Sequence, residues 1–145
     1  MASSDLTLKL KWEMPASRDR VWRALTEPEE VAKWWGPDGF ATPSIELDLR
    51  VGGAYRFAMQ PPEGDRFHLS GEFTEVEPPS RLAYTFVWDP PNPDDRETVA
   101  TLSLEDAGDS TKVRLVQGSF ATDERLALHR DGWTESLEKL AALFS

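Results

Sequence analysis

Two histidines, His68 and His129, are the only side chains of this chain that titrate near neutral pH, so acid–base chemistry has few candidates. The chain has no cysteine, which excludes disulfides, thiolate zinc sites and cysteine nucleophiles. The spacing of the histidines does not match a helical zinc motif, and no G-x-S-x-G, P-loop or G-x-G-x-x-G sequence occurs. We therefore predict no catalytic residue, no metal and no cofactor.

Aromatic side chains are the second group with chemical potential, because pockets for apolar ligands are lined mainly by such groups. They recur at alternate positions of several segments, which places them on one face of a strand. Dense aromatic residues also form ordinary cores, and this alternative stays open. The residues predicted to line a ligand cavity are Trp34, Trp35, Tyr55, Phe57, Phe67, Phe73, Tyr84, Phe86, Trp88, Arg130, Trp133 and Leu137.

Arg130 is the charged residue of this set. It is included because it lies between Leu126 and Trp133 in the apolar stripe of a predicted helix. A charge inside a cavity needs a partner or a ligand of opposite charge, since burying an isolated charge is costly. The alternative is an arginine that packs its stem and keeps its guanidinium in water. Arg56, Glu72 and Gln117 are the other polar residues expected to face the cavity, judged from their proximity to aromatic positions.

One long helix must position the C-terminal members of this set. Apolar residues follow three- and four-residue steps through residues 122–144 when Arg130 fills one gap, which predicts a helix roughly 34 Å long. Thr122 suits its N-cap position. Gly132 interrupts the helix at a cost of roughly 0.5–1 kcal/mol relative to alanine. Its absent side chain either permits close packing on a sheet or leaves room for a ligand beside Trp133.

The rest of the chain is predicted to form a sheet. Apolar and polar residues alternate in seven segments, which predicts strands over 6–13, 44–49, 54–59, 67–76, 82–88, 97–104 and 111–117. Two short helices, over 17–25 and 26–35, separate the first strand from the second. Short links make neighbours of consecutive strands, and the first strand must return to an edge or close the sheet against the last. The predicted class is α+β, a curved antiparallel seven-stranded sheet wrapped around the C-terminal helix.

Length and charge limit the remaining classes. The 145 residues are expected to form one domain, residues 1–145, with room for a core and a cavity. A net charge of −10 disfavours nucleic acid and anionic membrane surfaces as partners. No apolar run has membrane-spanning length, and the N-terminus lacks the features of a signal peptide. We expect a cytoplasmic protein without membrane insertion, and the oligomeric state, including a homodimer, stays open.

Several motifs resemble those of a known superfamily. They are Val21–Pro28, Trp34–Pro37, Gly52-Gly53, Gly71–Phe73, Glu77–Phe86 and Gly132-Trp133. Together they resemble the SRPBCC superfamily, and within it the bacterial branch similar to the C-terminal domain of the activator of Hsp-90 ATPase. The resemblance implies the helix-grip fold shared with birch pollen allergen and START lipid-transfer domains, in which the C-terminal helix closes a cavity over the sheet. It implies no universal catalytic set.

Three functional hypotheses follow. The first is binding of a small hydrophobic or amphipathic molecule between the C-terminal helix and the sheet. The second, allowed by the resemblance, is a cyclase- or aromatase-type enzyme whose acid–base groups would be Arg56, Glu72, Tyr84 or His129. The third is a protein-interaction module related to chaperone ATPase activators, with Trp34–Pro37 or the loop over residues 90–93 as its contact. Exposure of Trp34 and Trp35 as one apolar patch would favour this module, and burial of both would exclude it.

Overall fold

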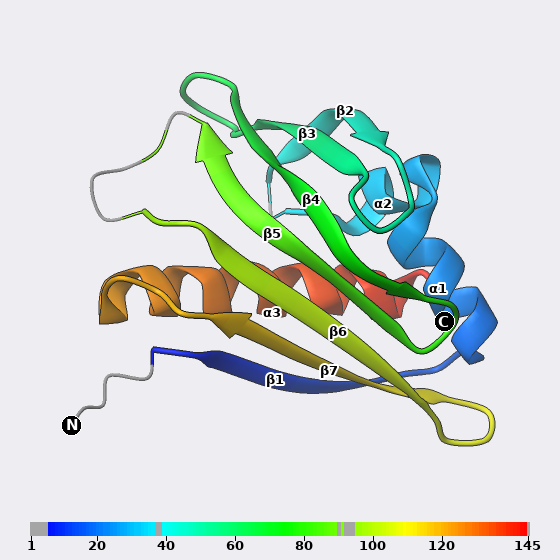
Figure 1. Ribbon diagram of the computed structural model, residues 1–145. Coiled ribbons are helices and arrows are strands. Elements are labelled where there is room, and N and C mark those ends of the chain that lie inside the picture. Colours follow the sequence, from blue (N-terminus) through cyan, green and yellow to red (C-terminus); the bar gives the residue numbers. More distant parts are fainter. Residues whose placement is uncertain (1–5, 37–38, 90, 92–94, 145) are drawn as a thin grey trace.

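The computed structural model describes residues 6–36, 39–89, 91 and 95–144 (Figure 1). The strands are β1 (Leu8–Met14), β2 (Ala41–Leu47), β3 (Ala54–Gln60), β4 (Phe67–Glu77), β5 (Arg81–Asp89), β6 (Thr98–Asp106) and β7 (Thr111–Gly118). The helices are α1 (Arg18–Thr26), α2 (Pro28–Trp34) and α3 (Asp123–Ala142). This order of elements is the predicted one.

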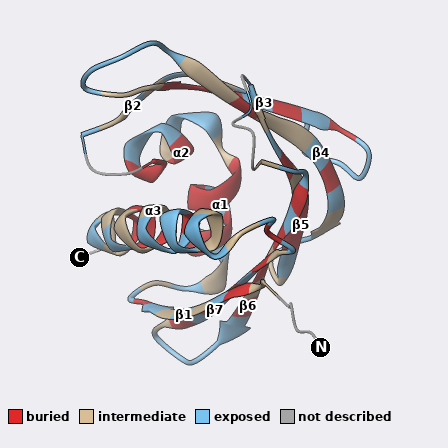
Figure 2. Ribbon diagram, turned by 90° about the vertical axis from the view of Figure 1, so that its left-hand side faces the viewer, coloured by how far each residue is buried: buried red, intermediate tan, exposed pale blue. Residues whose placement is uncertain are grey.

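All seven strands form one antiparallel sheet in the order β1-β7-β6-β5-β4-β3-β2. The first strand pairs with the last, Leu8 opposite Gln117, and lies at one edge of an open sheet, so the predicted return to an edge is confirmed. Figure 2 shows the sheet curving around α3, with α1 and α2 on the same concave side. The predicted helix-grip α+β fold is therefore confirmed.

Helix α3 begins where the sequence predicts it. The hydroxyl of Thr122 accepts a hydrogen bond from the backbone N–H of Arg125, and Asp123 and Glu124 in the first turn stabilise the positive end of the helix dipole. The buried face consists of His129, Trp133, Ser136, Leu137 and Leu140. This face turns toward the concave side of the sheet.

The prediction that Arg130 lies in this buried stripe is wrong. Each residue of an α-helix advances about 100° around the axis, so adjacent residues cannot share a narrow face. His129 is buried and fills the gap between Leu126 and Trp133, whereas Arg130 is exposed. Both positions satisfy steps of three and four residues, and the arginine takes the side that reaches water.

Helices α1 and α2 are held together by one buried tryptophan. The Trp34 side chain is 1% exposed, and its indole Nε1–H donates to the Ala24 carbonyl at 2.8 Å. Within α1 that carbonyl would accept from the residue four positions on, which is Pro28 and has no N–H. The indole therefore satisfies a carbonyl that the helix itself cannot, and it fixes the start of the following turn, where Trp35 and Gly36 lie.

No helix in the described part of the chain is long and apolar enough to cross a membrane.

Candidate functional site

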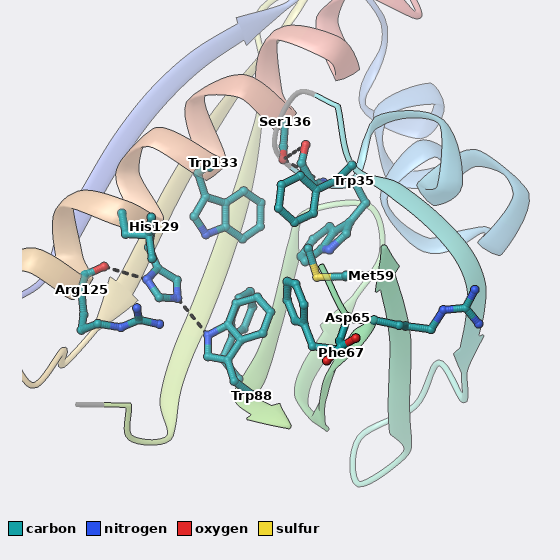
Figure 3. A pocket seen from close by; sticks show the side chains of 15 residues that line it. Trp35, Met59, Asp65, Phe67, Trp88, Arg125, His129, Trp133 and Ser136 are labelled. Atoms are coloured by element: carbon teal, nitrogen blue, oxygen red, sulfur yellow. Dashed lines mark hydrogen bonds between the residues drawn. The ribbon is translucent and has the colours of Figure 1, made fainter. Parts of the chain in front are cut away.

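A cavity of about 410 Å³ lies between α3 and the concave face of the sheet. This volume falls within the range of roughly 300–1,000 Å³ that is usual for small-molecule sites. Figure 3 shows its walls, with His129, Trp133 and Ser136 contributed by α3 and Trp88 and Phe67 by the sheet. The lining residues are Trp35, Gly36, Phe40, Met59, Asp65, Arg66, Phe67, Phe86, Trp88, Arg125, Leu128, His129, Gly132, Trp133 and Ser136.

The deep wall of the cavity is aromatic. Trp35 packs edge-on against Trp133, with ring centroids 5.3 Å apart. The ring centroids of Trp35 and Phe86 are 6.1 Å apart. Phe86 is followed along β5 by Trp88 at 6.0 Å. The edge-to-face geometries at Trp35–Trp133 and Phe86–Trp88 are the favoured ones for aromatic pairs. These rings are braced by one another, so the deep wall is a preformed apolar surface.

A buried chain of hydrogen bonds holds Trp133 in this wall. Its indole Nε1–H donates to Gln117 Oε1 at 2.7 Å, and Gln117 Nε2 donates to the Thr98 hydroxyl at 2.9 Å. Gln117 is fully buried, so its amide needs both partners. The polar edge of Trp133 is thus bonded within the sheet, and its rings face the cavity.

Ser136 joins α3 to the turn after α2. Its hydroxyl accepts from the Gly36 backbone N–H at 3.1 Å and donates to the Gly36 carbonyl at 3.2 Å. The backbone of Gly36 has a φ of +99°, a conformation that glycine adopts without strain. One side chain therefore satisfies both polar groups of a buried turn residue at the cavity wall.

His129 is the titratable group that the cavity encloses most fully. Its Nδ1 lies 2.7 Å from the Arg125 carbonyl, and its Nε2 lies 3.0 Å from the Trp88 indole Nε1 (Figure 3). A carbonyl only accepts and an indole N–H only donates, so the contacts assign the neutral tautomer with the proton on Nδ1. Burial lowers the pKa of His129 below its ordinary value of 6.5, against the opposing effect of the Arg125 carbonyl.

This lowered pKa predicts that the protein loses stability in mild acid. The unfolded chain takes up a proton on His129 near pH 6.5, whereas the folded chain does so only at lower pH, so acidification below pH 6.5 favours unfolding. The contribution is at most about 1.4 kcal/mol per pH unit within that window. We expect His129→Phe to remove it. Urea unfolding of both proteins between pH 7.5 and 5 measures the difference, in which the titration of carboxylates shared by both cancels. Parallel stability curves for the two proteins would contradict this prediction.

Charged groups near the cavity occur at its rim. Arg125 and Asp95 form an ion pair at 2.6 Å, with side chains 16% and 6% exposed. Asp65 and Arg66 are exposed on the opposite rim. The charge of Arg125 is thus balanced by a carboxylate, and the deep wall formed by the aromatic rings is apolar.

The structure brings part of the predicted lining set together. Trp35, Phe67, Phe86, Trp88 and Trp133 line the cavity. Six further members are buried but do not line it, namely Trp34, Tyr55, Phe57, Phe73, Tyr84 and Leu137. Most of them surround a space of about 10 Å³, room for one water molecule at most. They form the core, as the alternative interpretation stated, and Arg130 is exposed and outside the cavity.

Sequence reasoning omitted several lining residues from the predicted set. They are Gly36, Phe40, Met59, Asp65, Arg66, Arg125, Leu128, His129 and Ser136. Met59 follows Tyr55 and Phe57 on the same strand face, and His129 precedes Trp133 by one helical turn, so their periodicity contained a signal. Phe40, Asp65 and Arg66 lie outside the regular elements, where periodicity gives no direction. Gly132 lines the cavity, in agreement with its interpretation as a position that leaves room beneath the helix.

The acid–base set suggested for an enzyme is not assembled. Arg56 and Glu72 are exposed, and the Arg56 guanidinium forms an ion pair with Asp89, Nη2 to Oδ2 at 3.7 Å. Tyr84 is buried in the core, and burial raises the pKa of its phenol. Of these candidates only His129 lines the cavity, and its Nε2 lone pair already accepts from Trp88. In the described residues no cluster of three or more histidine, aspartate or glutamate side chains could hold a metal ion.

The predicted contacts of an interaction module have different outcomes. Trp34 and Trp35 are 1% and 6% exposed, so they form no apolar surface patch, and this is the outcome expected to exclude an interaction module. Pro37 lies outside the described residues, as do residues 90, 92 and 93 of the second proposed contact.

Comparison with known proteins places this geometry among similar chains. The profile of the family described as Activator of Hsp90 ATPase homolog 1-like protein matches residues 15–145. The structure of protein CV1439 from Chromobacterium violaceum is 30% identical with a TM-score of 0.82, over 94% of this chain and 96% of that one. Protein NE0264 from Nitrosomonas europaea is 31% identical with a TM-score of 0.82, over 98% and 96%. The AHSA1 protein SPO3351 from Silicibacter pomeroyi is 31% identical with a TM-score of 0.81, over 94% and 95%. No curated protein matches the sequence.

Proposed function

The chain belongs to the family of Activator of Hsp90 ATPase homolog 1-like proteins, and we propose that it binds a small apolar or amphipathic molecule in the cavity between α3 and the sheet. The observation that carries the proposal is the 410 Å³ space with its wall of braced aromatic rings. Proteins of this fold commonly bind ligands in a cavity.

The cavity can supply a useful binding energy. A ligand of two fused rings buries roughly 150–250 Å², as an aromatic side chain does, which at about 25 cal/mol per Å² gives about 4–6 kcal/mol. A dissociation constant of 1 μM corresponds to about 8 kcal/mol, and association has its own entropic cost. A ligand with micromolar affinity must therefore fill more of the space than two rings or form a polar contact as well.

A neutral fluorescent probe tests the proposal directly. N-phenyl-1-naphthylamine is expected to show a saturable, one-to-one increase in emission with the folded protein, because its fluorescence rises in apolar surroundings. The rings of Trp35, Trp133 and Trp88 line the cavity, so the same titration should quench or shift tryptophan emission. Urea-unfolded protein is the control. A linear, non-saturating response, or an equal response from unfolded protein, would contradict ligand binding.

A further inference from the structure

The polar groups of the cavity wall differ in how firmly their partners are fixed. Ser136 is bonded to both backbone groups of Gly36, and Trp133 donates to the buried Gln117. Trp35 Nε1 and Arg125 Nε have no hydrogen-bond partner among the described residues, but both atoms are enclosed by protein and out of a ligand's reach. The remaining contact is that between Trp88 and His129, which joins a sheet residue to α3 across the cavity wall.

The two sides of this contact are unequal. His129 is 9% exposed, and its Nδ1–H is held by the backbone of its own helix, so the imidazole presents Nε2 as a fixed acceptor. Trp88, near the exposed end of β5, is only partly buried. Its ring packs against that of Phe67, which is also partly buried. The indole N–H of Trp88 can exchange His129 for water, whereas a buried Nε2 without a donor is costly. Replacing the Trp88 indole by a donor of the ligand therefore costs little free energy, because His129 Nε2 keeps a donor and Trp88 bonds to water.

The surroundings also determine the charge of such a donor. Arg125 lies one turn before His129 on α3, and its charge is balanced by Asp95, so this pair attracts no ion to the imidazole. Asp95, the carboxylate that faces this region from the segment before β6, is occupied by Arg125. The apolar wall of Trp35, Phe86 and Trp133 disfavours any unpaired charge.

We propose that the ligand carries a neutral hydrogen-bond donor, a hydroxyl or ring N–H on an aromatic body, which replaces the Trp88 indole as the donor to His129 Nε2. The apolar body then lies against Trp35 and Trp133 (Figure 3), and against Phe86. This proposal rests on the proposed function and specifies the class of molecule that the cavity selects.

Two matched probes, 4-phenylphenol and 4-methoxybiphenyl, test the donor separately from the apolar body. They share the biphenyl framework, but only the phenol can donate, and at pH 7.5 both the phenol and His129 are neutral. Calorimetry and tryptophan fluorescence give their dissociation constants. We expect the phenol to bind more tightly by a few-fold, and at most roughly tenfold, the value of one full hydrogen bond, because the Trp88 bond is exchanged and not added.

Variants at both partners give opposite expected results. Trp88→Phe removes the competing donor and keeps an aromatic ring, so the phenol should bind more tightly while the ether does not. His129→Phe removes the acceptor and should abolish the preference for the phenol, whereas His129→Gln offers an amide oxygen and should restore part of it. A merely structural role of Trp88 would instead weaken both ligands.

The indole resonances provide a readout independent of affinity. In a ¹H–¹⁵N spectrum, the Trp88 indole N–H, assigned through Trp88→Phe, should shift with the phenol toward the position of a water-exposed indole and remain bonded with the ether. Equal affinities of the two probes with an unchanged Trp88 resonance would overturn the donor proposal and leave the proposed function intact. Failure of both probes to bind, together with failure of the neutral fluorophore, would overturn both proposals.

Discussion

Replacing Trp34 with alanine is expected to lower the free energy of unfolding by about 3–5 kcal/mol, the usual cost of truncating a buried tryptophan. The side chain is 1% exposed, and Trp35 packs against it with ring centroids 5.4 Å apart. Truncation also removes the donor to the Ala24 carbonyl, for which Pro28 provides no substitute. Denaturant unfolding followed by circular dichroism measures the loss.

Two variants separate packing from hydrogen bonding at this position. Trp34→Phe keeps most of the ring volume but lacks the N–H, so its smaller cost, about 1–3 kcal/mol, reports the unsatisfied carbonyl. Trp12→Ala truncates a partly buried tryptophan on β1 and should cost less than Trp34→Ala. A loss below about 1 kcal/mol for Trp34→Ala would show that Trp34 does not hold α1 and α2 together. Because Trp35 and Gly36 follow directly, weaker probe binding should accompany the loss of stability.

Substituting Gly132 with phenylalanine is expected to raise the dissociation constant of the fluorescent probe at least tenfold without destabilising the protein. Gly132 lines the cavity beside Trp133, so an added ring occupies space that the ligand needs. Phenylalanine has a higher helix propensity than glycine, so the substitution stabilises α3 itself. Probe titration and denaturant unfolding of the same samples measure the two effects.

Helix α3 offers a matched control for this substitution. Ala127 is exposed, so Ala127→Phe adds the same ring outside the cavity and should leave binding unchanged. Gly132→Ala should raise the free energy of unfolding by about 0.5–1 kcal/mol and reduce the cavity only by the volume of a methyl group. Unaltered probe affinity in Gly132→Phe would mean that the space under this glycine is not where the probe binds.

The fold was predictable because two periodicities determine it. Alternation with period two marked all seven strands, and the three- and four-residue steps marked α3, so the layers followed from burying one face of each. The same periodicity could not separate His129 from Arg130. Both fall within one turn of Trp133, and only the orientation of the helix on the sheet decides which is buried.

The candidate site was predictable only in part, because alternation gives the face of a strand and not the depth beneath a helix. Tyr55 and Phe86 belong to the same concave face, yet Phe86 lies under the cavity and Tyr55 under the short helices. Where α1 and α2 rest on the sheet, they fill the space that the sequence assigned to a ligand. The cavity remains at the other end, where α3 faces Phe67 and Trp88 without an intervening element.

The paired bonds of Ser136 to Gly36 make the two sides of the opening mechanically different. Widening the gap between α3 and the turn after α2 would break both bonds at once and leave a buried N–H and a buried carbonyl without partners. The opposite margin includes Leu128, an exposed side chain that can change rotamer while the backbone stays in place. Ligands would therefore enter and leave the cavity past Leu128. A bulkier residue at this position would slow ligand association and dissociation alike and leave the dissociation constant nearly unchanged.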